Sequence, residues 1–329
     1  MTKNKTLILD KKSIESLIDI KNSIKVIEDT FREYGMGKVL MPAKTYLDLK
    51  KYSGDFRAMP AYIETIDKCA IKWVNVHPEN KKFHLPSVMA VIILSDPVNG
   101  MPLCIMEGGY ITCIRTGAAG GVAAKYLARK DSEIIGMVGC GAQARTQLLA
   151  LNMIFKIKEV KVWGNEKALV LNFIKDMKKL NLKLIHTEKI EDCVRESDIV
   201  VTTTPSRKPI VMLEWLKKGT HINAIGADAK GKQELDPVIL KNAKVVIDSW
   251  EQASHSGEIN VALSKGIISK KDIFADIGEV VSGKKKGRTN NNELTVFDST
   301  GLAIQDVAVA NLIYQAAIRK KIGRWIELV

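Results

Sequence analysis

The sequence lacks the features that would tie it to a membrane or to a disulfide framework. Its longest apolar stretch, residues 85–94, contains Pro86 and falls well short of the ~20 residues that cross a bilayer. The apolar run near the start is too short for a signal core. The 5 cysteines are scattered without a CxxC pair, so we expect reduced, mostly buried thiols. These absences predict a cytoplasmic protein with no membrane association.

Metal-ligand spacings and nucleic-acid signatures are missing as well. The 5 histidines show neither i,i+4 pairing nor the spacing of metal ligands, so we predict no catalytic metal. The formal charge is +13, but the basic residues are spread along the chain without interleaved aromatics, so we predict no nucleic-acid partner. The one dense basic run, Lys284–Arg288, is better explained as a solvated loop.

What the sequence does contain is a pattern of alternating strands and helices. With 329 residues, 46% of them hydrophobic, the chain can bury a full core. From Glu133 onward, short β-branched runs alternate with helical patterns, which is typical of βαβ units around a parallel sheet covered on both faces. The strands expected in this region are Ile134–Val138, Val160–Trp163, Leu182–Ile185, Asp198–Thr202, His221–Ile225, Val245–Asp248 and Leu294–Phe297.

Residues 1–120 follow a different pattern. We predict a helix over Ser13–Tyr34, followed by irregular strands that prolines interrupt. A later helix, Ile304–Arg319, has few charges, which indicates burial against another domain or subunit. The sequence therefore predicts an α/β fold, in which a Rossmann-type doubly wound parallel sheet at residues 121–301 is inserted into a smaller α+β domain of residues 1–120 and 302–329.

A glycine-rich turn follows the first strand of the expected parallel sheet and opens a helix. The turn reads G-x-G-x-x-A and runs from Gly139 to Ala144. Gly139 permits the tight turn, Gly141 lets a pyrophosphate approach the backbone, and Ala144 allows close packing of helix on strand. The free amides and the dipole at the helix start then hold the phosphates. This strand-to-helix context predicts a dinucleotide cofactor.

The choice between NAD and NADP is expected at the end of the second strand of that sheet. An acid there binds the ribose hydroxyls and excludes a 2′-phosphate. No acid occupies the strand end itself, where Gly164 and Asn165 stand. Glu166 follows and favours NAD slightly, whereas Asn165 and Lys167 could accept the phosphate of NADP. We therefore expect NAD and leave NADP open.

A run of hydroxyl residues ends a later strand at the same edge. Thr203 and Thr204 could line the nicotinamide ribose, although a plain turn would have the same composition. The cofactor-binding residues that we predict, taken with the ends of neighbouring strands, are Gly139, Gly141, Ala142, Gln143, Ala144, Asn165, Thr203, Thr204, Ala224, Gly226 and Ser299.

Several separated strings together resemble one known family. They are GCGAQA followed by Arg145, VTTTPSRKPIV, GTHINAIGADAKGKQELD, FDSTGLAIQDVAVA, Ile71–Asn75 and Ile114–Ala119. The chain resembles the ornithine cyclodeaminase and mu-crystallin family, and most closely its archaeal-type alanine dehydrogenase branch. The likeness extends over nearly the whole chain.

The resemblance implies a homodimer whose terminal segments form a dimerisation and substrate domain, with the Rossmann domain inserted. It also implies an active site between the two domains that uses a lysine, an arginine and an aspartate. At the matching positions this sequence has Lys72, Arg115 and Asp228. The substrate expected is a small amino acid or 2-oxo acid, and L-alanine, oxidised to pyruvate and ammonia or formed in the reverse direction, is our first choice.

The chemistry of these residues suits oxidative deamination. The planar fork of Arg115 can pair with a substrate carboxylate through two hydrogen bonds. Lys72 lies in an apolar strand pattern, so an inward orientation would lower its pKa toward the range of a proton-transfer group. Asp228 follows a strand at the carboxyl edge of the sheet, from which it could accept a proton or activate water. Alone, each residue could also be structural, and the assignments depend on the resemblance.

The charge around the expected pocket bears on the choice of substrate. Lys44 and Arg57 add positive charge there, and we assign both to substrate binding. A pocket that binds ornithine would require an acid to neutralise the distal ammonium. Asp55 is the nearest acid to Arg57. Ornithine cyclodeaminase, a cyclic imine reductase and a non-catalytic NADP-binding protein remain the alternatives.

Overall fold

The computed structural model describes residues 4–328 and divides the chain into two units. The first unit consists of Met1–Arg115 and Leu302–Val329, of which residues 1–3 and 329 lie outside the described residues. The second unit consists of Thr116–Gly301. Helix α3 (Gly109–Leu127) contains the boundary between the two units.

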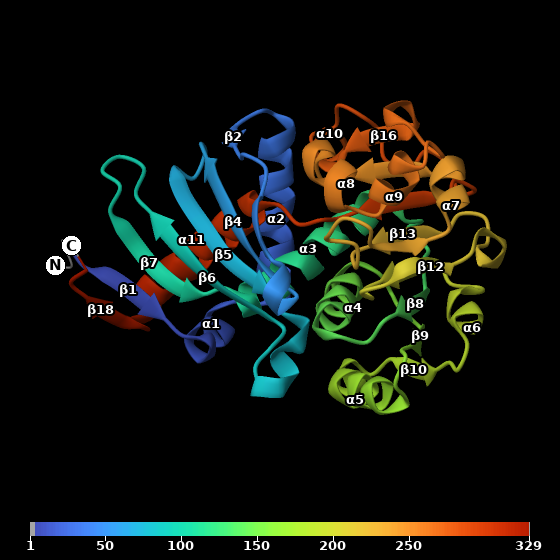
Figure 1. Ribbon diagram of the computed structural model, residues 1–329, viewed down its shortest axis with the longest axis horizontal. Coiled ribbons are helices and arrows are strands. Elements are labelled where there is room, and N and C mark those ends of the chain that lie inside the picture. The colour runs from blue at the N-terminus through green and yellow to red at the C-terminus, as the bar shows by residue number, and fades with distance from the viewer. Residues whose placement is uncertain (1–3, 329) are drawn as a thin grey trace. The chain divides into compact units, whose positions relative to one another are not determined.

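The first unit is built around a mixed sheet of 8 strands (Figure 1). Strands β1 and β7 are parallel, and the other neighbours are antiparallel. In spatial order the strands are β18 (Arg324–Ile326), β1 (Thr6–Leu9), β7 (Pro102–Glu107), β6 (Val88–Ser95), β5 (Lys68–Val76), β4 (Gly54–Ile63) and β2 (Val39–Leu40), with β3 (Thr45–Leu49) paired to β4.

One face of this sheet is covered by helix α11 (Ala303–Lys320), which contacts β4, β5 and β6. The alternation along β5 sets the two faces: Ala70, Lys72 and Val74 are buried, whereas Trp73 between them is 44% exposed. The predicted helix over residues 304–319 is thus present, with one more residue at each end.

The predicted single helix over Ser13–Tyr34 is wrong. The structure has two helices, α1 (Lys11–Leu17) and α2 (Ile20–Gly35), separated by an extended Ile18. Two aspartate caps explain the break: Asp10 accepts the amide of Ser13, and Asp19 accepts the amide of Asn22. The short 3-10 helices of this unit are η1 (Lys50–Tyr52) and η2 (Pro78–Phe83).

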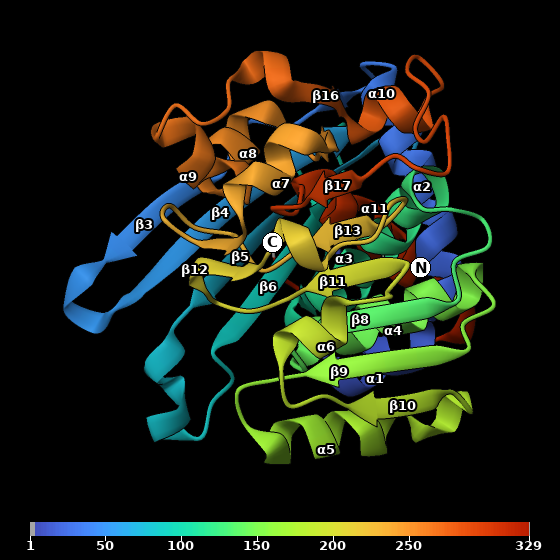
Figure 2. The same cartoon turned by 90° about the vertical axis from the view of Figure 1, so that its right-hand side faces the viewer.

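The second unit contains the predicted parallel sheet, which has 8 strands. All of its neighbouring strands are parallel, and the strand order reverses between β8 and β11, as in dinucleotide-binding folds (Figure 2). In spatial order the strands are β10 (Lys183–His186), β9 (Glu159–Trp163), β8 (Ile134–Val138), β11 (Ile199–Thr202), β13 (His221–Ala224), β17 (Thr295–Asp298), β15 (Lys244–Ile247) and β16 (Ile273–Asp276).

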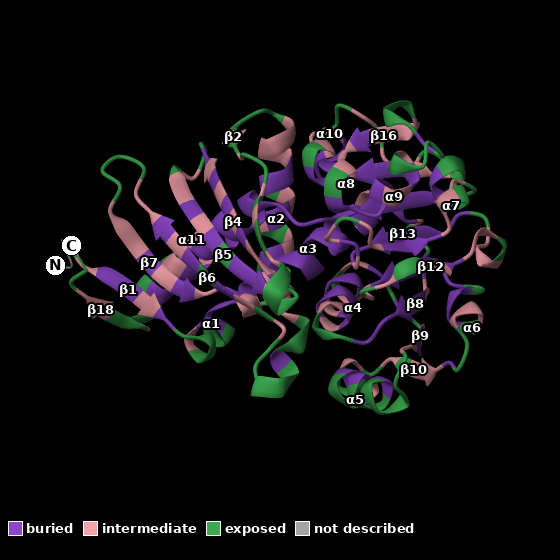
Figure 3. Ribbon diagram, in the orientation of Figure 1, coloured by how far each residue is buried: buried purple, intermediate pink, exposed green. Residues whose placement is uncertain are grey.

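The seven strands that the sequence predicts are all present, and the predicted α/β fold is confirmed. Adjacent residues of β11 explain why Ile199–Val201 are all apolar, because Ile199 packs into the core on one face and Val200 into the core on the other. Figure 3 shows the central strands of this unit, such as β8 and β13, as buried and much of α5 as exposed. The helices of this unit are α4 (Ala142–Ile154), α5 (Lys167–Met177), η3 (Lys178–Leu180), α6 (Ile190–Val194), η4 (Leu213–Trp215), α7 (Pro237–Asn242), α8 (Trp250–Ser256), α9 (Ile259–Ser264), η5 (Lys270–Asp272) and α10 (Ile277–Val281).

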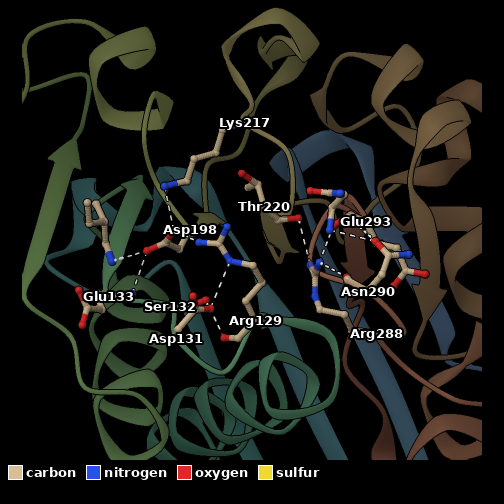
Figure 4. Close-up of polar contacts among 12 residues, drawn as sticks. Arg129, Asp131, Ser132, Glu133, Asp198, Lys217, Thr220, Arg288, Asn290 and Glu293 are labelled. Atoms are coloured by element: carbon tan, nitrogen blue, oxygen red, sulfur yellow. Dashed lines mark hydrogen bonds and ion pairs between the residues drawn. The ribbon is translucent and has the colours of Figure 1, made fainter.

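A polar network lies at the amino ends of these parallel strands (Figure 4). Asp198 accepts the amides of Glu133 and Ile134 and forms ion pairs with Arg129 and Lys217. These bonds satisfy backbone groups where β8 begins.

The basic run predicted as a solvated loop is partly structural. Arg288 donates to the carbonyls of Leu127 and Glu293 and to the hydroxyl of Thr295. Lys285 donates to the carbonyl of Phe274. Both side chains therefore hold the run against neighbouring segments instead of extending into solvent.

Among residues 4–328, no helix is long and apolar enough to cross a membrane. The expected cytoplasmic location stays a prediction.

A small sheet of β12 (Arg207–Val211) and β14 (Gln233–Leu235), which the sequence analysis did not predict, lies outside the main sheet of the second unit.

Candidate active site

The first unit brings a lysine, an arginine and an aspartate together in its core. Lys72 Nζ lies 2.7 Å from Asp306 Oδ2, and Arg115 Nε donates to Asp306 Oδ1 over 3.1 Å. Arg115 also donates to Gln305 Oε1 over 2.7 Å. All four side chains are buried. Lys72, Arg115 and Asp306 are called the buried trio below.

Each member of the buried trio comes from a different element. Lys72 is a middle residue of β5 and points toward the face that α11 covers. Arg115 lies on α3, and Asp306 lies in the first turn of α11, where the helix dipole favours a carboxylate. The side chains therefore converge from a strand and two helices, which fixes their relative positions.

The buried trio shifts the protonation of its lysine. Burial, and then the neighbouring Arg115 guanidinium, lower the pKa of Lys72 to about 7 against the opposing effect of Asp306. Lys44 adds a smaller contribution in the same direction as Arg115. A lysine whose pKa lies near neutrality can both take up and release a proton at physiological pH.

Arg57, a further predicted substrate-binding cation besides Arg115 and Lys44, is already paired with an acid. Its Nε donates to Asp55 Oδ1 over 2.7 Å, and its Nη2 donates to Asp55 Oδ2 over 3.1 Å. In the register of β4 and β5, Met59 pairs with Lys72 and Arg57 pairs with Val74. Because residues two apart on a strand point to the same face of the sheet, Arg57 lies on the same face as Lys72. Asp55 is thus neutralised by Arg57 and offers no unpaired charge for a distal ammonium.

The glycine-rich turn of the second unit has the geometry that a pyrophosphate requires. Gly139 has a φ of +109°, and a Cβ there would lie 2.5 Å from Thr203 Oγ1. A Cβ on Gly141 would meet nothing within 4 Å, and no side chain caps the start of α4 at Gly141. The backbone at the start of α4 therefore faces open space with uncapped amides, which suits a phosphate.

Buried polar atoms without partners gather among the predicted cofactor residues. Gln143 Oε1, Thr203 Oγ1 and Ser299 Oγ are buried and have no hydrogen-bond partner. Buried polar groups are normally paired, so unpaired ones call for a ligand. The second strand ends as the sequence predicts, and Asn165 and Glu166 are both exposed there. These observations fit a dinucleotide, and Glu166 could reach a ribose from this edge.

Asp228 lies in the second unit, in the loop after β13. It forms an ion pair of 2.5 Å with Lys232 and is partly exposed. Ala224 ends β13, and Gly226 begins the same loop. The other predicted catalytic residue, Lys72, belongs to the first unit, as do the predicted substrate-binding residues Arg115, Arg57 and Lys44, so the structure groups them separately from Asp228.

The sequence analysis missed Asp306 and Gln305. Asp306 is the one charged residue between Ile304 and Ile318 in a helix that the sequence predicted to be buried. A lone acid in a buried helix requires a cation as its partner. That signal was available, whereas the identity of the partners depends on residues 191 positions away for Arg115 and more than 200 for Lys72, and could not be read from spacing.

Comparison with known proteins decides the family. The model of the ornithine cyclodeaminase/mu-crystallin family matches residues 4–321. The chain belongs to this family. The predicted resemblance is therefore confirmed, and the buried trio and glycine-rich turn are features of a family member. Among residues 4–328, no group of three or more His, Cys, Asp or Glu side chains could hold a metal ion.

Three relatives illustrate the similarity. Alanine dehydrogenase of Archaeoglobus fulgidus is 50% identical over 98% of each chain. The solved structure of an archaeal alanine dehydrogenase dimer with bound NAD superposes with a TM-score of 0.95, at 50% identity, and covers 99% of this chain and 100% of that one. Delta(1)-pyrroline-2-carboxylate reductase of Thermococcus litoralis, solved with NADH and L-proline, has a TM-score of 0.95 at 40% identity, with 97% and 99% coverage.

Proposed function

We propose that this family member is an NAD-dependent L-alanine dehydrogenase, which converts L-alanine to pyruvate and ammonia and catalyses the reverse reaction. The observation that carries the proposal is the buried trio, because it places a lysine of near-neutral pKa beside a guanidinium. The 50% identity to an alanine dehydrogenase along nearly the whole chain supports the choice of substrate.

In this mechanism the first unit binds the substrate and moves its proton. Arg115 holds the substrate carboxylate. Lys44 adds positive charge near Lys72, whereas the charge of Arg57 is offset by Asp55. Lys72 in its neutral form accepts the proton that the substrate ammonium loses, so that hydride loss from the α-carbon gives an iminium. Water then adds to the iminium carbon, and ammonia leaves to give pyruvate. Asp306 orients Lys72 and Arg115 by accepting from both. Asp228, as a second catalytic group, would activate the water that attacks the imine.

NAD, when bound, accepts the hydride that leaves the α-carbon. The residues that would hold it are those of the glycine-rich turn, together with Asn165, Thr203, Thr204, Ala224, Gly226 and Ser299. Exposed Glu166 and the NAD(H) complexes of similar structures support NAD over NADP.

A substrate panel tests the proposed function. Purified protein is supplied with L-alanine, L-ornithine and L-proline, each with NAD and with NADP, and with pyruvate plus ammonia and a cyclic imino acid, each with NADH and with NADPH. The absorbance of the reduced nicotinamide is followed throughout. We expect net NADH formation with alanine. Proline and ammonia formed from ornithine without net NADH would assign a cyclodeaminase instead. Reduction of a cyclic imine with no activity on pyruvate and ammonia would assign an imine reductase.

The pH dependence follows from Lys72. Its pKa of about 7 means that the neutral form, which accepts the proton, predominates above pH 7. We therefore expect kcat/KM for alanine oxidation to rise as the pH increases through this value, and kcat/KM for reductive amination to fall over the same range. Initial rates in both directions across the pH range check this. Profiles that are flat near pH 7 in both directions would contradict the role of Lys72.

We also propose a homodimer formed through the sheet face opposite α11. The strand register places on that face the side chains of Ala58, Pro60, Ile71, Trp73, Val91 and Ile93. Trp73 and Val91 are 44% and 45% exposed in the single chain, and Trp73 stacks on Phe56 at 5.2 Å. Exposed apolar patches of this kind mark association sites. The alanine dehydrogenase of similar structure is a dimer.

Replacing Trp73 by glutamate should separate the dimer. The change puts a charge into the proposed interface without touching the face that carries Lys72. Light scattering after size exclusion is expected to give about twice the chain mass of 36.4 kDa for the unmodified protein and a single chain for Trp73→Glu. Leu169→Glu on α5, at 45% exposure, is the matched control and should remain dimeric. A dimeric Trp73→Glu would exclude this face.

A further inference from the structure

A buried glutamate ties together two loops that follow neighbouring strands of the parallel sheet. Glu234, on β14, is fully buried. Its carboxylate accepts the amide of Thr204 over 2.6 Å and the amide of Gly226 over 3.0 Å. Thr204 lies in the loop after β11 and Gly226 in the loop after β13. One carboxylate therefore fixes the backbone of both loops.

The packing around Gly226 shows how closely the two loops approach. A Cβ at this position would lie 2.3 Å from the carbonyl oxygen of Thr204 and 2.4 Å from Glu234 Oε2. No side chain fits there without displacing backbone, so glycine is required for the carboxylate to reach its amide. The predicted cofactor contact at Gly226 is thus also the point where Glu234 binds.

A second buried carboxylate supports the first. Glu258, between α8 and α9, accepts the amides of Glu234 and Leu235 over 2.8 and 2.7 Å. Asp298, at the end of β17, accepts the amide of Ile259, the residue after Glu258. The titratable groups that act on Glu258 are both acidic, Glu234 and Asp298.

The choice of a glutamate at this buried position has a chemical reason. An ionised carboxylate accepts two amide hydrogens and offers no donor, whereas a glutamine would present an NH₂ group to one of the two amides. Burial raises the pKa of Glu234 to about 7, and burial and the nearby Glu234 raise the pKa of Glu258 well above its ordinary value. The charge of Glu234 consequently changes near neutral pH.

We propose that Glu234 is a positioning residue for the cofactor site, which acts by holding the Thr203–Thr204 and Gly226 loops in the shape that the nicotinamide half of NAD requires. The inference rests on the proposed function, because it takes these loops as cofactor contacts. Ionised Glu234 holds both amides through charge-assisted bonds, and its protonation weakens them. Cofactor affinity is therefore coupled to pH through a residue that does not touch the cofactor.

The test is the affinity for NADH in the absence of substrate, followed by nicotinamide fluorescence. For the unmodified protein, the Kd is expected to fall several-fold from about pH 6 to about pH 8. Glu234→Gln should raise the Kd about tenfold at the upper pH and abolish its pH dependence. At saturating NAD its kcat for alanine oxidation should change less than about twofold, since the reacting groups are intact.

Glu293→Gln is the matched control. Glu293 also accepts several hydrogen bonds, from Lys244 and Thr289, but near the amino end of β17, and its replacement should leave the Kd for NADH unchanged. An unchanged Kd in Glu234→Gln would overturn the proposal. The pH series on the unmodified protein needs no variant to fold, and a Kd that is constant over this range would also overturn it. If the unmodified protein binds neither NADH nor NADPH, the proposed function fails instead.

Discussion

Lys72→Met is expected to lower kcat for alanine oxidation by about three orders of magnitude, because the group that carries the proton is lost. Methionine matches the length and apolar stem of lysine and fits a buried strand position. In this variant Asp306 still accepts the hydrogen bond from Arg115, so the buried carboxylate keeps a cationic partner. The thermal unfolding midpoint should therefore remain close to that of the unmodified protein, or rise, because a buried ammonium is costly to desolvate.

Steady-state rates and NADH affinity distinguish this loss from misfolding. The Kd for NADH should be unchanged in Lys72→Met, since the cofactor residues belong to the second unit. Lys68→Met is the control on the same strand, because Lys68 is partly exposed and donates to the carbonyl of Asp67. It should retain full activity. A Lys72→Met enzyme with kcat within about tenfold of the unmodified protein would remove Lys72 from proton transfer.

Arg115→Ala is expected to lower kcat/KM for alanine by about two to three orders of magnitude, mainly through KM. The substrate carboxylate loses the guanidinium that donates two hydrogen bonds to it, and each hydrogen bond to a charged group contributes about 1.5–3 kcal/mol to the binding free energy. A second effect follows, because Arg115 helps to lower the pKa of Lys72. Its removal should move the pH profile of alanine oxidation to higher pH.

The control for this variant is Arg32→Ala, since Arg32 is a half-exposed arginine of the same unit that pairs with Asp29 on α2. It should leave both KM and the pH profile unchanged. The Kd for NADH is expected to be the same in both variants. An Arg115→Ala enzyme with an unaltered KM for alanine would show that the substrate carboxylate binds elsewhere.

The second unit could be predicted well from sequence because its signals are local. Each strand of the parallel sheet is a short apolar run whose position depends on its own residues, and the glycine-rich turn lies in one continuous segment. The prediction of a single N-terminal helix also failed for a local reason. Asp10 and Asp19 are the caps of two separate helices, but the continuous apolar pattern concealed the two helix starts.

The candidate site was harder to predict, because its decisive contacts are distant in sequence. Lys72 and Arg115 came from the family resemblance, and the pairing of both with Asp306 became visible only when α11 was placed on the sheet. Glu234 carried no signal of its own, because a glutamate in a short polar segment is ordinary. Burial and the identity of a partner are tertiary properties that periodicity does not encode.

The buried trio also links substrate binding to the proton balance of the solution. With Lys72 neutral, Arg115 and Asp306 cancel, and with Lys72 protonated the trio carries one positive charge. An incoming pyruvate, whose carboxylate arrives without an ammonium group, is stabilised more by the charged state, so its binding draws a proton onto Lys72 when the pH is near 7. The enzyme would thus take up a fraction of a proton from the buffer as pyruvate arrives, and Lys72 then carries the charge that reductive amination requires of an acid.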